Sequence, residues 1–189
     1  DYDAGPSAHP LRIVYTPMHG VGARLGERAL QEAGYTDLHP VPEQREPDGD
    51  FPTVRFPNPE EPGALDLARG LAKRVDADII LANDPDADRL AVAVRTEEGG
   101  YQILTGDQTG AVLGWDRLRQ KEAKPHPVAV ATTIVSSQLL SKLAAAQGAE
   151  YFETLTGFKW IANGAIDRRP QGTEFLFGYE EAIGFTLGE

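Results

Sequence analysis

The sequence predicts an α/β fold of two tandem α/β domains with mixed, mainly parallel sheets flanked by helices. Short apolar runs rich in β-branched residues alternate with helical patterns along the whole chain. Such alternation favours parallel strands joined by crossover helices. The pattern starts afresh near residue 105, so we expect one domain over residues 1–104 and a second over 105–189.

The first half contains strand and helix patterns on either side of a proline-rich stretch. Six prolines between Pro42 and Gly63 disfavour any regular element, so this stretch is predicted to be a long loop. The expected elements are a strand over 11–16, a helix ending at Gly34, a strand over 35–41, a helix over 64–75, a strand over 77–82, and a hairpin of strands 90–95 and 101–104.

The second half repeats the alternation. The expected elements are a helix over 107–118, a Lys- and Pro-containing turn, a strand over 127–132, a helix capped by Ser136 or Ser137 and ended by Gly148, a strand over 150–155, a helix over 158–166 and a final strand over 174–177. A glycine-flanked loop, 178–184, follows that strand. In sheets of this kind, ligand sites gather at the carboxyl ends of strands.

Composition limits the function classes. With 41% hydrophobic and 25% charged residues, no long apolar run and no signal segment, the chain is expected to be a soluble cytoplasmic protein without membrane partners. It has no cysteine, which excludes disulfides, thiolate catalysis and Cys-based zinc sites. A net charge of −11 without a Lys/Arg stripe argues against nucleic acid. The only methionine is Met18, so we interpret the chain as a piece of a longer protein.

Three aspartates at alternate positions, Asp84, Asp86 and Asp88, directly follow a predicted buried strand. In extended backbone, alternate side chains point the same way about 6 to 7 Å apart, and a modest curl brings their oxygens together. Mg²⁺ prefers oxygen ligands and often shares a few carboxylates with phosphate or water. The pattern predicts a magnesium site, and its alternative is a solvated acidic turn or a helix cap.

Two other interpretations of the aspartates can be tested on the residues. A calcium loop of the EF-hand type fails because Arg89 and Arg95 stand where glycine and glutamate are required. An aspartyl-phosphatase pattern would make Asp84 the nucleophile and Asp86 its acid/base. Asp88 occupies the usual Thr/Val position, which weakens this interpretation but leaves it open.

The turn over residues 16–22 has glycines between a strand and a helix, an arrangement that can bind phosphate. Its glycines Gly20 and Gly22, with Gly26, miss the dinucleotide-binding spacing by one residue, so close packing is the favoured explanation. His19 is expected to be structural. The remaining histidines stand in no metal-like spacing: His9, His39 and His126.

Two further segments carry candidate binding residues. Lys159 lies in Thr156-Gly157-Phe158-Lys159, between a strand and a helix, where it could reach a phosphate or hydroxyl group. Glu180 and Glu181 stand in the glycine-flanked loop, where carboxylates could accept hydrogen bonds from sugar hydroxyls. The alternatives are a solvated lysine and a capped turn.

Four motifs in this order resemble the α-D-phosphohexomutase superfamily, specifically its phosphoglucomutase/phosphomannomutase members. They are Thr-Pro-x-His-Gly-x-Gly (16–22), Asp-Pro-Asp-Ala-Asp-Arg (84–89), Thr-Gly-Phe-Lys (156–159) and Gly-Tyr-Glu-Glu-Ala-Ile-Gly (178–184). The resemblance covers nearly the whole chain, as the second and third of that family's four domains. Residues 1–104 would then carry the metal-binding loop and 105–189 the sugar-binding loop.

The resemblance implies an intramolecular phosphotransferase that works through a phosphoserine and a sugar bisphosphate intermediate. Asp84, Asp86 and Asp88 would hold Mg²⁺, and Arg89 would lie beside the transferring group. Lys159 would contact the substrate or assist proton transfer. The substrate-binding residues would be Thr156, Gly157, Lys159, Glu180 and Glu181.

The chain departs from the family pattern in two ways. The first and fourth domains, with the serine loop and the phosphate-binding loop, are not among these residues, and Ser136 and Ser137 have the wrong context to replace the serine. The chain alone is therefore expected to be inactive, and a non-catalytic binding module is a third hypothesis. Ala182 stands where hexose mutases often have serine, a form closer to phosphopentomutase-type members. Glucose, mannose and pentose phosphates all stay open as substrates.

Overall fold

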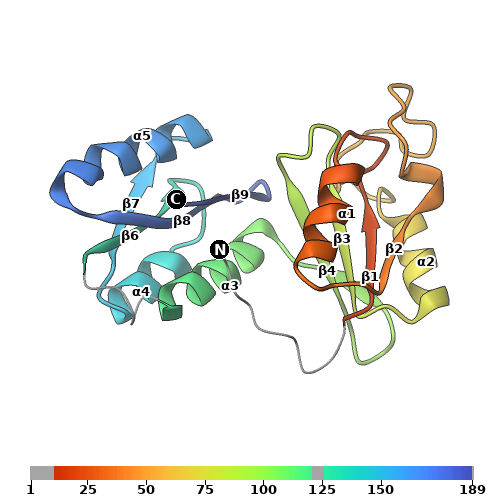
Figure 1. Ribbon diagram of the computed structural model, residues 1–189, viewed down its shortest axis with the longest axis horizontal. Helices are drawn as coiled ribbons and strands as arrows, with labels where there is room; N and C mark the ends of the chain where they lie inside the picture. The colour runs from red at the N-terminus through yellow and green to blue at the C-terminus, as the bar shows by residue number, and fades with distance from the viewer. Residues whose placement is uncertain (1–10, 121–125, 189) are drawn as a thin grey trace. The chain divides into compact units, whose positions relative to one another are not determined.

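The computed structural model describes residues 11–120 and 126–188, which form helices packed on two separate sheets (Figure 1). The chain divides into two compact units, Asp1–Leu104 and Thr105–Glu189. Each is an α/β unit with a mixed sheet, so the predicted fold class is confirmed. Within the described ranges, no helix combines the length and apolar composition that crossing a membrane needs.

The first unit has a five-stranded sheet of order β2-β1-β3-β4-β5. Strand β1 runs parallel to β2 and β3, whereas β4 is antiparallel to β3 and β5 to β4. Its elements are β1 (Ile13–Thr16), α1 (Ala23–Glu32), β2 (Leu38–Pro40), the 3₁₀ turn η1 (Pro42–Gln44), α2 (Asp66–Val75), β3 (Ile79–Asn83), β4 (Leu90–Arg95) and β5 (Tyr101–Ile103).

Alternation along β1 separates the two faces of this sheet. Val14 packs with Ile80 and with Ala68 of α2 in one buried cluster. Tyr15 points to the other face. There α1 approaches the tyrosine closely, because Gly26 has no side chain and a Cβ at that position would lie 2.7 Å from the Tyr15 hydroxyl oxygen.

The second unit has a four-stranded sheet of order β7-β6-β8-β9. Strand β6 is parallel to β7 and β8, and β9 is antiparallel to β8. Its elements are α3 (Gly106–Arg119), β6 (Val128–Thr133), α4 (Leu139–Ala146), β7 (Glu150–Thr154), α5 (Phe158–Arg168), the 3₁₀ turn η3 (Arg169–Gln171), β8 (Glu174–Glu180) and β9 (Gly184–Leu187).

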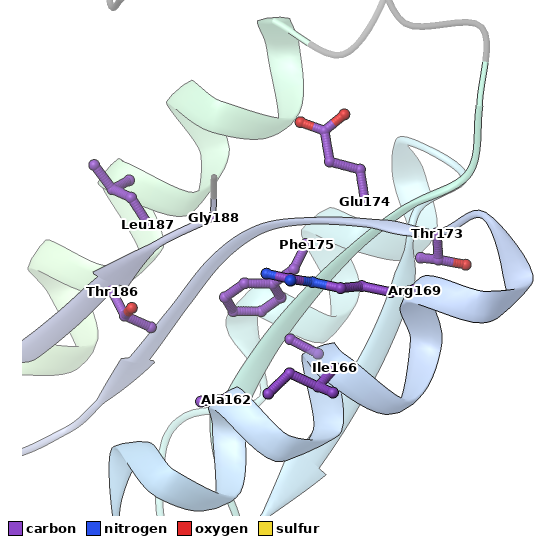
Figure 2. Close-up of a pocket in the computed structure, with 10 residues that line it drawn as sticks. Ala162, Ile166, Arg169, Thr173, Glu174, Phe175, Thr186, Leu187 and Gly188 are labelled. Carbon is purple, nitrogen blue, oxygen red and sulfur yellow. The ribbon is translucent and has the colours of Figure 1, made fainter.

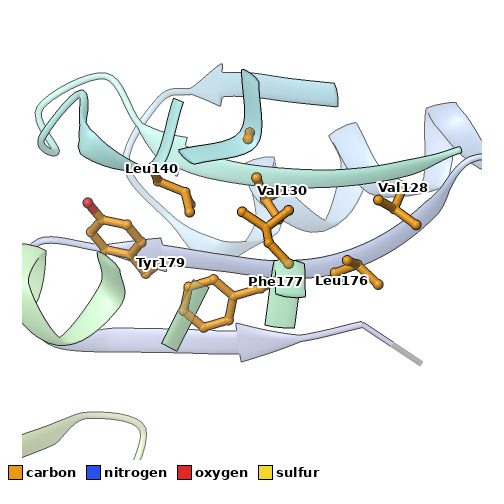
Figure 3. Close-up of a cluster of buried hydrophobic side chains, with 8 residues drawn as sticks. Val128, Val130, Leu140, Leu176, Phe177 and Tyr179 are labelled. Carbon is orange, nitrogen blue, oxygen red and sulfur yellow. The ribbon is translucent and has the colours of Figure 1, made fainter. Parts of the chain in front are cut away.

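The core of this unit lies between the sheet and the pair α3 and α4. Leu118 and Leu140 from the helices meet Phe177 and Tyr179 from β8, as Figure 3 shows for the last three. On the opposite face, Ile161 of α5 packs in a second cluster over β6 and β7. Burial on both faces stabilises β6 at the centre of the sheet.

The prediction for the end of the last strand, at residue 177, was wrong. Strand β8 continues past Phe177 to Glu180, and β9 returns antiparallel to it, so the predicted 178–184 loop is a hairpin with a turn of three residues. Gly178 suggested a loop, but it lies inside the strand. A Cβ there would be 2.9 Å from the Ile161 side chain, so the glycine serves close packing.

Smaller differences concern element ends. The strand predicted over 35–41 is shorter, η1 interrupts the predicted long loop, and α4 begins at Leu139 with Gln138 as its N-cap. The Ser137 hydroxyl nevertheless accepts the Leu139 N–H at 3.2 Å. His9 and most of the turn predicted after Leu118 lie outside the described residues.

Candidate functional site

The aspartate loop, residues 84–89, joins β3 to β4. Asp84 is buried at the end of β3, while Asp86 and Asp88 are exposed. One oxygen of each carboxylate lies within 4.8 Å of the others. Among the residues that the structure describes, this is the one group of three or more acidic, histidine or cysteine side chains so arranged.

The backbone curl that gathers these carboxylates comes from Ala87. This residue has φ +63°, and its N–H donates to the Asp84 carbonyl at 3.0 Å. The Arg89 N–H donates to Asp84 Oδ1 at 3.1 Å, which fixes the buried carboxylate. A local turn thus converts alternation along the chain into convergence.

Electrostatics make this loop suitable for a cation. Burial raises the pKa of Asp84 above its usual value, and the charges of Asp86 and Asp88 raise it further, against the hydrogen bond from the Arg89 N–H. Arg89 Nε lies 3.6 Å from Asp84 Oδ2 and 4.0 Å from Asp88 Oδ1. Three carboxylates beside a single arginine leave excess negative charge, and oxygen donors suit Mg²⁺. The three aspartates therefore fit a divalent cation.

The turn over residues 16–22 packs against the aspartate loop. A Cβ at Gly20 would lie 2.3 Å from the Pro85 Cα, and the Val21 N–H donates to the Pro85 carbonyl at 2.9 Å. His19 is buried, with Nε2 2.8 Å from Thr53 Oγ1. Close packing accounts for Gly20, and His19 has a structural partner, as expected from the sequence.

The glutamate loop, residues 180–184, joins β8 to β9. Glu180 is the last residue of β8, and its Oε1 accepts the Gly157 N–H at 2.5 Å. Ile183 has φ +57° and is only 1% exposed, so its side chain anchors the turn in the core. The structure thus brings Gly157 and Glu180, 23 residues apart, into direct contact.

Glu181 is held by two hydroxyl groups that sequence reasoning did not assign to the site. Its Oε2 accepts from Thr133 Oγ1 at 3.0 Å and Ser136 Oγ at 3.3 Å, and these two hydroxyls lie 2.8 Å apart. Thr133, the last residue of β6, and Ser136, three residues later, are both buried. The only signal in the sequence is a polar pair just after a buried strand, in a sheet that also delivers the glutamates.

The segment over residues 156–159 lies at the start of α5. Gly157 has φ +121°, a conformation open to glycine. Thr156 and Lys159 are exposed, and Lys159 Nζ lies 5.3 Å from the centroid of the Trp160 ring. Lys159 therefore lies at the protein surface, two residues after Gly157, whose backbone N–H contacts Glu180.

A cavity of about 350 Å³ lies elsewhere in the second unit, between α5 and the β8–β9 hairpin (Figure 2). Phe175, Ile166 and Arg169 are among its lining residues. None of the predicted site residues lines it, so it is separate from the two acidic loops.

Comparison with protein families gives two adjacent matches. Residues 3–99 match the domain described as phosphoglucomutase/phosphomannomutase, alpha/beta/alpha domain II. Residues 105–189 match alpha/beta/alpha domain III of the same family. Together the matches cover almost the whole chain.

Curated relatives are similar over most of this chain but are much longer. A phosphoribomutase of Saccharomyces cerevisiae is 44% identical over 92% of the chain and 30% of its own length. A probable phosphomannomutase of Haemophilus influenzae is 46% identical over 94% and 34%, and a phosphopentomutase of Mus musculus is 41% identical over 93% and 29%. The chain thus spans about a third of the length of these relatives.

Solved structures agree in fold. A phosphoglucomutase/phosphomannomutase family protein of Burkholderia thailandensis has a TM-score of 0.74 at 23% identity, covering 95% of this chain and 36% of that one. A putative phosphomannomutase of Thermus thermophilus has a TM-score of 0.69 at 24% identity, covering 93% and 37%. At this level of identity, the likeness supports the fold alone.

Proposed function

The chain belongs to the phosphoglucomutase/phosphomannomutase family, and on that premise we propose that the whole protein is a phosphosugar mutase. It would move a phosphoryl group between the 1-hydroxyl and the 5- or 6-hydroxyl of a sugar phosphate. The observation that carries the proposal is the convergence of Asp84, Asp86 and Asp88 within 4.8 Å. The named relatives act, by their names, on ribose, pentose and mannose phosphates.

The proposed reaction uses a phosphoserine in a part of the whole protein outside this chain. Its phosphoryl group passes to the free hydroxyl of the sugar monophosphate, which gives a bisphosphate and a free serine. After the bisphosphate turns round, its other phosphoryl group returns to the serine, and the isomeric monophosphate leaves. Phosphate is conserved overall, so no water is consumed.

In this proposal the aspartate loop holds Mg²⁺ through Asp84, Asp86 and Asp88. When bound, Mg²⁺ would supply positive charge against the oxygens of the transferring phosphoryl group. Arg89 would supply a second, permanent positive charge next to the same group. Its contacts with Asp84 and Asp88, at 3.6 and 4.0 Å, support this role because they keep the guanidinium beside the carboxylates.

The glutamate loop would bind the sugar. Glu180 uses one oxygen for the Gly157 N–H, which orients the carboxylate and leaves its other oxygen for a hydroxyl. Glu181 would lie close behind Glu180, with one carboxylate oxygen held by the Thr133 and Ser136 hydroxyls. Thr156, Gly157 and Lys159 would complete the sugar-binding surface, with Lys159 contacting the substrate or assisting proton transfer.

The phosphatase alternative, with Asp84 as nucleophile, lacks support. None of the relatives named above is a phosphatase. Asp84 is 8% exposed and its Oδ1 accepts the Arg89 N–H, so one of its two carboxylate oxygens is already engaged. The mutase is therefore the function we propose.

The test is product analysis with the whole protein. Ribose 1-phosphate, glucose 1-phosphate and mannose 1-phosphate would each be supplied with a trace of the matching bisphosphate and Mg²⁺. A mutase yields the 5- or 6-phosphate, and the fastest substrate identifies the sugar. Release of inorganic phosphate instead would overturn the proposal in favour of a phosphatase. No turnover of any of the three sugars would favour the non-catalytic binding module.

A further inference from the structure

Asn83, the last residue of β3, spans the two ends of the aspartate loop with its side-chain amide. Its Nδ2 donates to the Arg89 carbonyl at 2.5 Å, which ties the residue before Asp84 to the residue after Asp88. Its Oδ1 accepts from the Tyr15 hydroxyl at 2.9 Å. One amide therefore adds a hydrogen bond across the base of the loop, where Asn83 also pairs with Leu90 between β3 and β4, and connects the loop to β1, 68 residues away.

The Tyr15 hydroxyl is confined from the helix side. Tyr15 is 2% exposed, and its oxygen would lie 2.7 Å from a Cβ at Gly26 and 3.0 Å from one at Gly22. These two glycines thus leave the volume that the hydroxyl occupies. Burial, assisted by the charge of Glu27, raises the pKa of Tyr15 to about 12, so the hydroxyl keeps its proton at neutral pH and can donate it to Asn83.

Asn83 and Tyr15 face a loop whose charges oppose closure. Asp84, Asp86 and Asp88 repel one another because their carboxylate oxygens lie within 4.8 Å, and an unsupported loop would relax by spreading. The hydrogen bond across its base resists that movement, because the Arg89 carbonyl cannot move away from Asn83 without leaving the amide unpaired.

We propose that Tyr15 and Asn83 are positioning residues that hold the aspartate loop in its metal-binding form before an ion arrives. This inference rests on the proposed function, since it concerns the same metal site. Neither residue is among the three aspartates that would hold the ion. Their contribution is to metal affinity, through the shape of the loop, rather than to the fold of the sheet.

The experiment is a Mn²⁺ titration of the 189-residue chain, with free Mn²⁺ measured by electron paramagnetic resonance. Tyr15→Phe removes the hydroxyl while keeping the ring. Its matched control is Tyr101→Phe in the same unit, which removes a hydroxyl that donates to the Ala72 and Ala77 carbonyls, away from the loop. We expect Tyr15→Phe to weaken Mn²⁺ binding roughly tenfold, as for other residues that orient metal ligands. Tyr101→Phe should stay within about twofold, since it touches no ligand.

Thermal melting in a chelator measures the stability of each variant without metal, which separates metal affinity from folding. The titrations are run well below the melting temperatures of wild type and variants. Wild-type affinity in Tyr15→Phe would overturn the inference, even if that variant melts earlier. Asn83→Ala supplies a second comparison with the same expected direction. If the wild-type whole protein shows no saturable Mn²⁺ binding that Asp86→Asn removes, the metal site itself fails and with it the proposed function. Loss of affinity in Tyr15→Phe and not in Tyr101→Phe supports both.

Discussion

The two acidic loops of this chain have the same construction but opposite chemical needs. Each turns between antiparallel strands through a residue with positive φ, Ala87 in the aspartate loop and Ile183 in the glutamate loop. In the aspartate loop the carboxylates crowd one another, and the pKa of Asp84 is raised by burial and, to a lesser extent, by their repulsion. In the glutamate loop, neutral donors from neighbouring strands and helices hold each carboxylate separately.

The difference teaches what each loop can bind. Crowded carboxylates with uncompensated charge favour a cation, because only opposite charge relieves their repulsion. Carboxylates already oriented by hydroxyl and amide donors keep a free oxygen and can accept from neutral hydroxyls. The expected effects of changing each loop therefore differ in kind as well as in size.

The largest effect is expected from Asp86→Asn in the whole protein. Loss of one proposed metal ligand should reduce the proposed mutase turnover on the order of 10³-fold, since a catalytic metal contributes several kcal/mol. The measurement is steady-state conversion of the sugar 1-phosphate at saturating Mg²⁺. Asp50→Asn removes the same charge from an exposed loop position and should retain activity. Comparable losses in both variants would refute a specific role for the aspartate loop.

Metal addition should affect the two loops unequally. Mg²⁺ at about 100 times its dissociation constant should stabilise the unit that binds it by about 2.7 kcal/mol. Hydrogen–deuterium exchange of the 189-residue chain should then slow in residues 84–89 and stay unchanged in residues 180–184. Equal protection of both loops would contradict cation binding by the aspartate loop alone.

Glu180→Gln should lower the activity of the whole protein without changing metal binding by the aspartate loop. Removal of a charged hydrogen-bond acceptor costs about 1.5 to 3 kcal/mol, which predicts at least a tenfold fall in kcat/KM. Mn²⁺ affinity of the 189-residue chain should match wild type. A parallel fall in Mn²⁺ affinity would contradict separate roles for the loops.

Ser136→Ala tests the donors behind Glu181. One of its two hydroxyl partners is lost, so we expect about 1 kcal/mol lower stability and a rise of a few-fold in KM with little change in kcat. Ser141→Ala, which removes an exposed hydroxyl bound to the Gln138 carbonyl, is the control. An unchanged KM would show that Glu181 needs only Thr133.

The smallest effect concerns pH. Because folding raises the Asp84 pKa above 3.8, the metal-free folded chain binds this proton more tightly than the unfolded chain. Stability from this group is therefore lost as pH rises from 3.8 through the raised value. The melting temperature of Asp84→Asn should lie closer to that of wild type at about pH 4. Its increase over wild type should be largest at about pH 7. Melting curves in a chelator measure this difference in melting temperature. A difference between variant and wild type that narrows with rising pH would contradict the prediction.

Local sequence signals predicted much of the fold but few of the residues that hold the candidate site residues in place. Alternating apolar runs and helix-stopping glycines such as Gly34 placed the strands and helices of both units, because these signals lie within one element. Gly178 misled because a packing glycine and a turn glycine look the same without the facing Ile161. The assignments of ligands to Asp84 or Glu180 stay predictions until metal and sugar binding are measured.

The partners of the site residues lie too far along the chain for pattern reasoning. Tyr15 meets Asn83 over 68 residues, and Thr133 meets Glu181 over 48. Each pair depends on which strands become neighbours, and no pattern within a single strand specifies that. Only the topology distinguishes these residues from others of the same type.

Ile183 has a consequence for engineering the proposed sugar-binding loop. A β-branched residue at φ +57° is strained, yet its side chain is almost fully enclosed. Glycine would relax the backbone and empty the enclosure, whereas a polar replacement would fill it with an unpaired group. Saturation libraries aimed at new sugars should therefore keep Ile183 fixed and diversify its half-buried neighbour Ala182.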